Sequence, residues 1–209
     1  MTRLARGEVI SGKYRIERTL SEGSATSVFQ ARHVDLGHHV AIKLLRAEPA
    51  PPSAAADRFR GAARASSRLQ GAHVCRVLDV GTHLDGAPLV VMEYLEGLHL
   101  GRELELHGPM AVAVAVRCVL EACDAVGAAH ACGIIHTDLK PSNLFWATQP
   151  DGSRQIKVIG FGVPKAGSAL DPGSAALSAT SSAVSSPAYM APEQLDATQG
   201  VDERTAVWA

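Results

Sequence analysis

A polar segment between two apolar ones, residues 136–143, constrains this chain more than any other part of its sequence. The segment reads His-Thr-Asp-Leu-Lys-Pro-Ser-Asn, after an Ile-Ile pair and before Leu-Phe-Trp. Asp138 is a candidate proton acceptor, Lys140 can neutralise a phosphate, and Asn143 offers a carbonyl oxygen to a hard cation. Taken alone, the segment fits a reaction centre and a polar turn between two strands about equally well.

Three other short motifs place this segment in a larger pattern. Residues 40–43 read Val-Ala-Ile-Lys, residues 160–162 read Gly-Phe-Gly, and residues 191–193 read Ala-Pro-Glu. In order and spacing, these three motifs and segment 136–143 resemble four motifs of bacterial-type Ser/Thr protein kinases. Along the chain, the family's motifs are the strand with the ATP-binding lysine, the catalytic loop, Asp-Phe-Gly and Ala-Pro-Glu. The resemblance runs from about Tyr14 to the last residue.

The resemblance implies an α+β protein with a two-lobed, protein-kinase-like fold. It assigns residues 1–13 to an N-terminal arm and 14–92 to a lobe with a five-stranded antiparallel sheet and one helix. Residues 93–97 are the hinge, and 98–209 form a mainly helical lobe that includes an activation-like segment at 160–193. Family members begin a central helix where this sequence stops, so the resemblance implies an incomplete, truncated C-terminal lobe.

Hydrophobic periodicity and turn residues predict the individual elements. The predicted strands are 14–20, 27–33, 39–45, 74–80, 88–94, 144–147 and 155–159, and the predicted helices are 57–70, 98–107 and 110–132. The last helix is rich in Ala and Val, and we expect it to be buried. Residues 166–186 are mostly Ser, Ala and Gly, and we expect this segment to be mobile.

The resemblance also assigns roles to individual residues. Asp138 would orient the substrate hydroxyl, Lys140 would steady the transferring phosphate, and Asn143 would be a metal ligand. The residues assigned to the ATP site are Gly23, Leu20, Val28, Ala41, Lys43, Met92, Glu93, Leu95 and Phe145. The apolar members of this set would enclose the adenine ring, although an ordinary hydrophobic core explains them equally well.

Several residues that carry the chemistry in this family are replaced here. Gly160 stands in place of the aspartate that holds magnesium, and Ala62 stands where a helix glutamate pairs with Lys43. Of the three glycines of the phosphate-binding turn, Gly23 alone remains, and Glu22 adds a negative charge beside it. The resemblance therefore leaves ATP binding open and argues against a magnesium site, with Asn143 as a weak lone ligand.

The overall composition excludes several classes of function. The formal net charge is −1, which gives no general attraction to nucleic acid or to a membrane surface. No signal peptide follows the first methionine, and acidic and basic residues interrupt the longest apolar stretch. The four cysteines show no metal-ligand spacing. We therefore expect a cytoplasmic protein with reduced thiols and no membrane span.

Three hypotheses follow from these observations. In the first, the chain is a pseudokinase that transfers little or no phosphate and acts as a nucleotide-binding or protein-binding regulatory module. In the second, it is an active Ser/Thr protein kinase with unusual metal ligation. In the third, it is a decayed product without a stable fold. The first two imply a protein substrate or a regulatory protein as the partner, and we favour the pseudokinase because phosphoryl transfer depends on the missing Glu and Asp.

Overall fold

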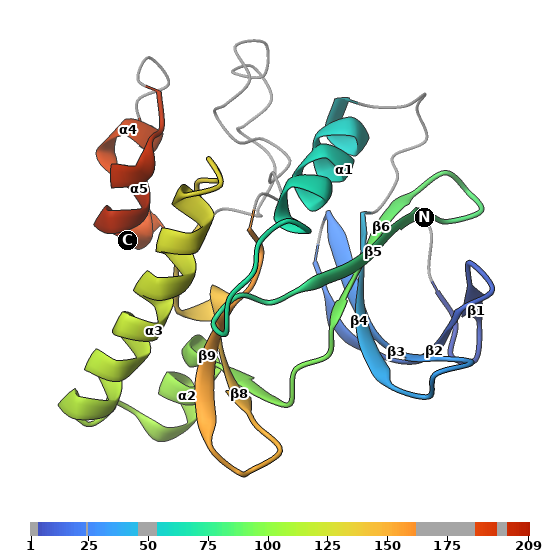
Figure 1. Ribbon diagram of the computed structural model, residues 1–209, viewed down its shortest axis with the longest axis horizontal. Helices are drawn as coiled ribbons and strands as arrows, with labels where there is room; N and C mark the ends of the chain where they lie inside the picture. The colour runs from blue at the N-terminus through green and yellow to red at the C-terminus, as the bar shows by residue number, and fades with distance from the viewer. Residues whose placement is uncertain (1–3, 24, 46–53, 162–186, 196–199) are drawn as a thin grey trace.

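The computed structural model describes residues 4–23, 25–45, 54–161, 187–195 and 200–209. The segment predicted to be mobile, 166–186, lies outside these residues. The described chain forms two parts that lie side by side, a sheet with one helix and a mainly helical part (Figure 1). This arrangement confirms the predicted two-lobed α+β fold.

The N-terminal part is built on one antiparallel sheet of six strands in the order β1-β2-β3-β4-β6-β5. The strands are β1 (Val9–Ile10), β2 (Tyr14–Glu22), β3 (Thr26–His33), β4 (His39–Leu45), β5 (Val77–Thr82) and β6 (Pro88–Glu93). On β4, side chains alternate between faces. Val40, Ile42 and Leu44 are fully buried in the core of the sheet. The side chain of Lys43 therefore lies on the opposite face.

The first residues of the chain add a sixth strand that the sequence did not predict. Leu4 and Ile10 are 5% and 2% exposed and belong to the core cluster of the sheet. The backbone N–H of Ile16 donates to the carbonyl of Glu8 at 2.9 Å, and that of Gly7 donates to Ile16 at 2.8 Å. Residues 4–13, assigned to an arm, therefore pack as part of the N-terminal lobe.

Helix α1 (Ala54–Ser66) covers one face of this sheet. It buries Phe59 and Ala63, which pack against Val90 of β6. The helix begins three residues before its predicted start and ends four residues before its predicted end. Leu69, which was predicted to lie in this helix, follows its end and is buried in the core of the other lobe.

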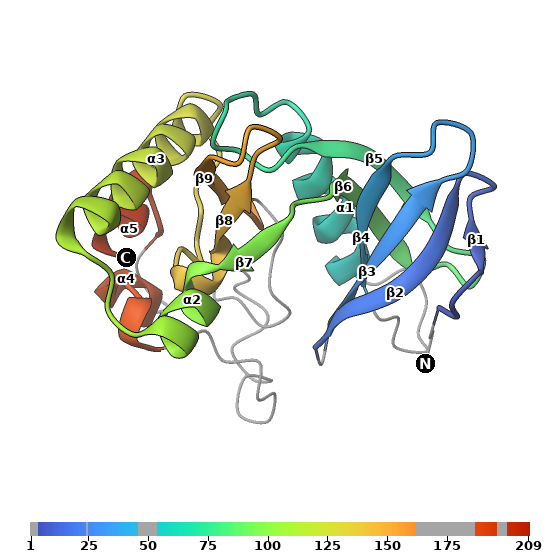
Figure 2. The same ribbon diagram turned by 90° about the horizontal axis from the view of Figure 1, so that it is seen from below.

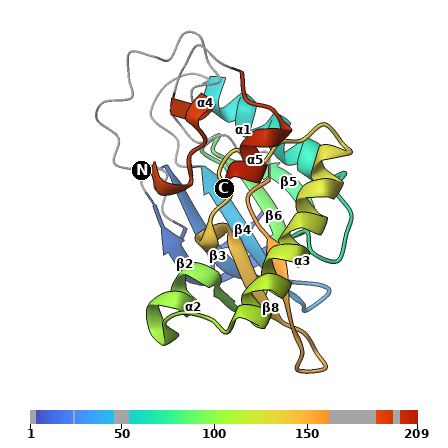
Figure 3. The ribbon, with the colours of Figure 1, turned by 90° about the vertical axis from the view of Figure 1, so that its left-hand side faces the viewer.

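The second part combines a short three-stranded sheet, in the order β7-β8-β9, with helices. Its elements are β7 (Gly97–His99), α2 (Leu100–His107), α3 (Val112–His130), η1 (Pro141–Asn143), β8 (Leu144–Thr148), β9 (Arg154–Val158), η2 (Pro187–Tyr189), α4 (Pro192–Leu195) and α5 (Glu203–Trp208). Residues 97–99, of which the last two were predicted to be helical, instead pair with β8. Helices α4 and α5 lie at the end of the molecule away from the six-stranded sheet (Figures 1 and 2), and Figure 3, viewed from that end, shows α5 beside α3.

Helix α3 corrects the expectation of a wholly buried helix. Small side chains line its buried face, including Ala122, Ala125 and Ala129, whereas larger ones lie on the opposite face. The exposed large hydrophobic side chains are Val112, Val116, Val119 and Leu120. Their spacing forms one apolar stripe along the helix. Within the described residues, none of the helices combines the length and apolar character needed to cross a membrane.

A charged cluster fixes the first residues against the turn between β5 and β6. His83 Nδ1 lies 2.8 Å from Asp85 Oδ1, and its Nε2 lies 3.2 Å from Glu8 Oε1. The second carboxylate oxygen of Glu8 accepts a hydrogen bond from the backbone N–H of Ala5. Burial alone would lower the pKa of His83, but hydrogen bonds to Asp85 and Glu8 outweigh burial and raise the pKa.

The raised pKa of His83 predicts a pH-dependent stability. A group whose folded pKa exceeds its unfolded value stabilises the fold fully below the unfolded pKa, and this stabilisation is lost as pH rises through the folded pKa. His83→Gln should therefore destabilise the protein more at about pH 6 than at about pH 9. Urea denaturation at both values should give a difference below about 1 kcal/mol, because such pairs are partly screened. The exposed His38→Gln variant is the control, and an equal loss at both values contradicts the assignment.

Candidate functional site

Three polar side chains converge immediately before strand β8. Asn143 Nδ2 donates to Asp138 Oδ2 at 2.9 Å and to the backbone carbonyl of Asp138 at 2.6 Å. Lys140 Nζ lies 3.2 Å from the same Oδ2 atom. The 3-10 turn η1 brings these residues together, since the Asn143 N–H donates to the carbonyl of Lys140 at 2.8 Å. The sequence-predicted catalytic set is thus one hydrogen-bonded group.

His136 fixes the backbone of this loop, a role that sequence analysis did not assign. The backbone N–H of Asp138 donates to His136 Nδ1 at 3.2 Å. Because Nδ1 is an acceptor, Nε2 carries the hydrogen and donates to the carbonyl of Ile159 at 3.1 Å. His136 is 2% exposed. Its place at the start of the polar segment was the available signal, but sequence alone could not show that both ring nitrogens bind backbone.

Lys43 comes from the other lobe and reaches the same region. It lies on β4 opposite Val28 of β3 and Val90 of β6. Burial lowers the pKa of the Lys43 ammonium, and the negative charge of Asp138 opposes this effect. Lys43 of the N-terminal lobe and Asp138 of the catalytic loop therefore interact electrostatically across the two lobes.

Helix α1 offers Lys43 no acidic partner. Ala62, the predicted equivalent of the usual glutamate, is half-buried. The one carboxylate of the helix belongs to Asp57, which pairs with Arg60 at 2.8 Å. The orientation of α1 in this protein therefore does not depend on an ion pair to Lys43.

The residues expected to enclose a nucleotide base are apolar and mostly half-buried. Ala41 lies opposite Met92 in the β4–β6 pairing. Val28 and Phe145 are half-buried, and Leu20 is 37% exposed at the edge of the sheet. Met92 also packs against the cluster formed by α1 and β6. These side chains fit the apolar wall of a base-binding site and equally the margin of a core.

The side chain of Glu93, whose backbone the resemblance assigns to the adenine edge together with that of Leu95, is held at the connection between the lobes. The Glu93 carboxylate accepts hydrogen bonds from the Arg76 N–H at 2.9 Å and from Lys157 Nζ at 3.1 Å. Its backbone N–H already donates to the Arg76 carbonyl at 3.0 Å. Glu93, Leu95 and Lys157 line an open cavity of about 500 Å³ together with Gln149. The side chain of Glu93 thus stabilises the connection between the lobes.

The turn between β2 and β3 does not present a free glycine amide. The Gly23 N–H donates to the carbonyl of Thr26 at 2.8 Å, which closes the turn. A phosphate oxygen would have to displace this bond. The exposed Glu22 beside it adds a charge that repels phosphate. The surviving glycine therefore supports the hairpin rather than a phosphate cradle.

The residues around Gly160 do not fit a magnesium ion. Gly160 contributes no ligand atom, and the amide nitrogen of Asn143 is already directed at Asp138. Across the described part of the chain, no group of three His, Cys, Asp or Glu side chains is placed to hold a metal. Magnesium requires near-octahedral oxygen ligands, and one amide oxygen with one carboxylate that already binds Lys140 does not supply them.

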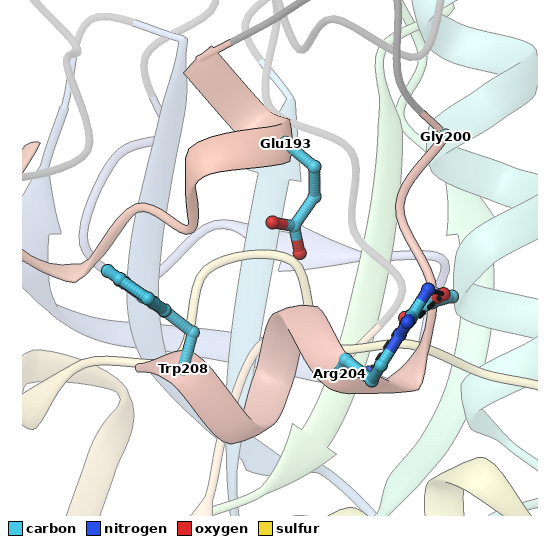
Figure 4. A pocket seen from close by; sticks show the side chains of 5 residues that line it. Glu193, Gly200, Arg204 and Trp208 are labelled. Carbon is cyan, nitrogen blue, oxygen red and sulfur yellow. Dashed lines mark hydrogen bonds and ion pairs between the residues drawn. The ribbon is translucent and has the colours of Figure 1, made fainter.

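Residues 191–194 are tied to the loop that carries Asp138. Gln194 Nε2 donates to the carbonyl of Thr137 at 2.7 Å, and Gln194 Oε1 accepts from the Ala191 N–H at 3.0 Å. Glu193 Oε1 accepts from Thr205 Oγ1 at 2.6 Å. Figure 4 shows Glu193 directed toward α5, where it lines a cavity of about 290 Å³ with Arg204 and Trp208. These bonds anchor α4 between the catalytic loop and α5.

Comparisons with known proteins agree with this geometry. Residues 14–209 match the family model described as "Protein kinase domain". The chain is 35% identical to serine/threonine-protein kinase pkn3 of Myxococcus xanthus over 97% of this chain and 37% of the relative. It is 31% identical to serine/threonine-protein kinase PknB of Mycobacterium tuberculosis, over 96% of this chain and 31% of the relative. The chain thus spans about a third of the length of these relatives.

A solved structure shows the same fold. The kinase domain of Mycobacterium tuberculosis PknI superposes with a TM-score of 0.72 at 25% identity, covering 97% of this chain and 72% of that chain. The family match spans almost the whole sequence. The chain therefore belongs to the protein kinase domain family, and its relatives are bacterial-type Ser/Thr protein kinases.

Proposed function

We propose that this protein is a pseudokinase, a kinase-like module that binds a nucleotide base or a protein partner and transfers little or no phosphate. The observation that carries this proposal is Gly160, which leaves the metal position without a carboxylate. In this family the metal neutralises charge that develops on the transferring phosphate. A metal supplies several kcal/mol in such a step, and each loss of about 1.4 kcal/mol slows a reaction about tenfold.

Two further features support the same proposal. Ala62 and the rest of α1 provide no acid to orient Lys43, whose ammonium is already disfavoured by burial. The Gly23 amide is committed to the β2–β3 turn. ATP phosphates would thus meet neither a metal nor a free glycine cradle, whereas the apolar positions around Ala41 and Phe145 suit a base. ATP therefore remains a candidate ligand and magnesium does not.

The alternative function is an active Ser/Thr protein kinase with unusual metal ligation. The specific observation in its favour is the intact catalytic loop. Lys140 and Asn143 hold the carboxylate of Asp138, which suits it to orient a substrate hydroxyl. The partner in this case is a protein substrate. In the pseudokinase it is a regulatory protein that recognises the kinase-like surface.

A phosphate-transfer assay distinguishes the two functions. We expect the wild type to transfer radiolabelled phosphate from ATP to a generic basic protein no faster than Asp138→Ala, which removes the proton acceptor. Gly160→Asp should recover little, because Ala62 and the altered phosphate turn remain and these parts act together. Transfer by the wild type well above Asp138→Ala would support the active kinase. Full activity of Gly160→Asp alone would show that the metal ligand was the one missing part.

The same substitution has a predictable effect on stability. Gly160 has a φ of +87°, in the left-handed region, but among the described residues an added Cβ would come within 4 Å of one atom, His136 Nε2, at 4.0 Å. Both Gly160→Asp and Gly160→Ala should therefore fold and lose roughly 1 kcal/mol of unfolding free energy through backbone strain. Urea denaturation measures this loss, and Gly160→Ala is the control for the carboxylate. A loss of 3 kcal/mol or more, about the cost of a lost core side chain, contradicts the open space at this site.

A further inference from the structure

Helix α1 carries a row of arginines that plays no part in the site around Asp138. Arg60, Arg64 and Arg68 are four residues apart, and side chains at this spacing lie on one face of a helix. The helix ends before Arg68, but its last turn continues, because the Arg68 N–H donates to the carbonyl of Ala65 at 3.1 Å. These three residues form the arginine row.

The arginine row lies outside the face of α1 that packs on the sheet. That face buries Phe59 and Ala63, whereas Arg64 and Arg68 are exposed to solvent. Gly61, beside the row, is exposed as well, and a Cβ added there would meet no described atom within 4 Å. A partner can therefore approach this side of the helix closely.

Acidic partners for the row are scarce in the described part of the chain. Asp57, in the first turn of α1, pairs with Arg60 at 2.8 Å, and residues 58–70 contain no carboxylate. Arg64 and Arg68 form no ion pair with a described side chain. By contrast, α2 and α3 each pair an arginine with a glutamate of the same helix. The row therefore presents positive charge that the described fold does not neutralise.

The chemistry of the row favours carboxylates on a second helix. A guanidinium group can donate two parallel hydrogen bonds to one carboxylate. Four residues advance a helix by about 6 Å, so acidic side chains at the same spacing on another helix would lie in register with the row. A nucleic acid or an anionic membrane is attracted by a broad positive field, which a net charge of −1 does not supply.

We propose that the arginine row is a docking site for an acidic helix of another protein, with carboxylates spaced four residues apart. This proposal gives a chemical class to the regulatory protein partner, and to that extent it rests on the function proposed above. Exposed ion pairs are individually weak and are screened by salt. The affinity should therefore be modest and should fall as the salt concentration rises.

Fluorescence anisotropy of the full chain with a designed peptide tests this proposal. The probe is a labelled, alanine-rich helical peptide with three glutamates spaced four residues apart, and we expect a dissociation constant of roughly 100 μM at low salt. Arg64→Glu should weaken binding about fivefold or more, because attraction becomes like-charge repulsion. Arg64→Gln, which removes the charge and keeps a good helix former, should weaken binding in the same direction.

Two controls separate docking from general attraction between opposite charges. Arg15→Glu makes the same change of charge at an exposed position on β2, and it should alter the dissociation constant by less than about twofold, because that site is not part of the row. A peptide of the same composition with its glutamates distributed around the helix should bind more weakly than the probe.

Three results would overturn the proposal. One is the absence of peptide binding at millimolar concentration, and another is an equal loss of affinity in Arg64→Glu and Arg15→Glu. The third is a duplex DNA oligonucleotide that binds more tightly than the peptide and depends on Arg64, which would assign the row to nucleic acid. The measurement uses neither ATP nor phosphate transfer, so an active wild-type kinase would contradict the pseudokinase function and leave the docking site standing.

Discussion

The candidate site depends on the carboxylate of Asp138, because groups from several segments converge on it. Lys140 and Asn143 approach the same oxygen atom, and His136 accepts the backbone N–H of the same residue. Lys43 adds an electrostatic attraction from the other lobe. A carboxylate held in this way is fixed before any substrate arrives, which is the condition for both catalysis and selective binding.

Two groups that phosphoryl transfer uses in this family are missing around this loop. Gly160 removes the metal ligand, and the charge-carrying partner of Lys43 on α1 is absent. The lobes are nevertheless joined by contacts that do not involve Lys43, such as the hydrogen bond from Ser66 to Phe161 and the ion pair of Glu93 with Lys157. The fold can therefore persist without the electrostatic groups that phosphoryl transfer requires. This separation of architecture from chemistry is the physical basis for the pseudokinase function that we propose.

Much of the fold could be predicted from the sequence, because its strongest patterns are local. The alternation in β4 and the long periodic run of α3 gave nearly correct elements. Strand β1 could not be predicted, since two residues carry no periodicity and Ile10 is buried in a cluster that residues of β2 and β6 complete. The exposed stripe of α3 was missed for a similar reason, because Ala and Val do not reveal which side of a helix will find a partner.

The site residues that belong to a motif could be predicted from the sequence. The hydrogen bonds that depend on the folded chain could not. Asp138, Lys140 and Asn143 were identified because their segment resembles the catalytic loop of protein kinases, and the structure brings them together. The hydrogen bond from the Gly23 N–H to the Thr26 carbonyl could not be predicted, because it exists only in the closed turn. The hydrogen bond from Ser66 to Phe161 could not be predicted either, because it joins residues 95 positions apart and serine at a helix end usually bonds locally.

The central claim is that any nucleotide binding by this protein does not use magnesium, and calorimetric titration tests it most directly. ATP would be titrated into the wild-type protein with magnesium in excess and again with a chelator. The account predicts the same dissociation constant in both conditions, within about threefold, because contacts to the base dominate. An affinity that rises about tenfold or more with magnesium, equivalent to about 1.4 kcal/mol, would contradict it.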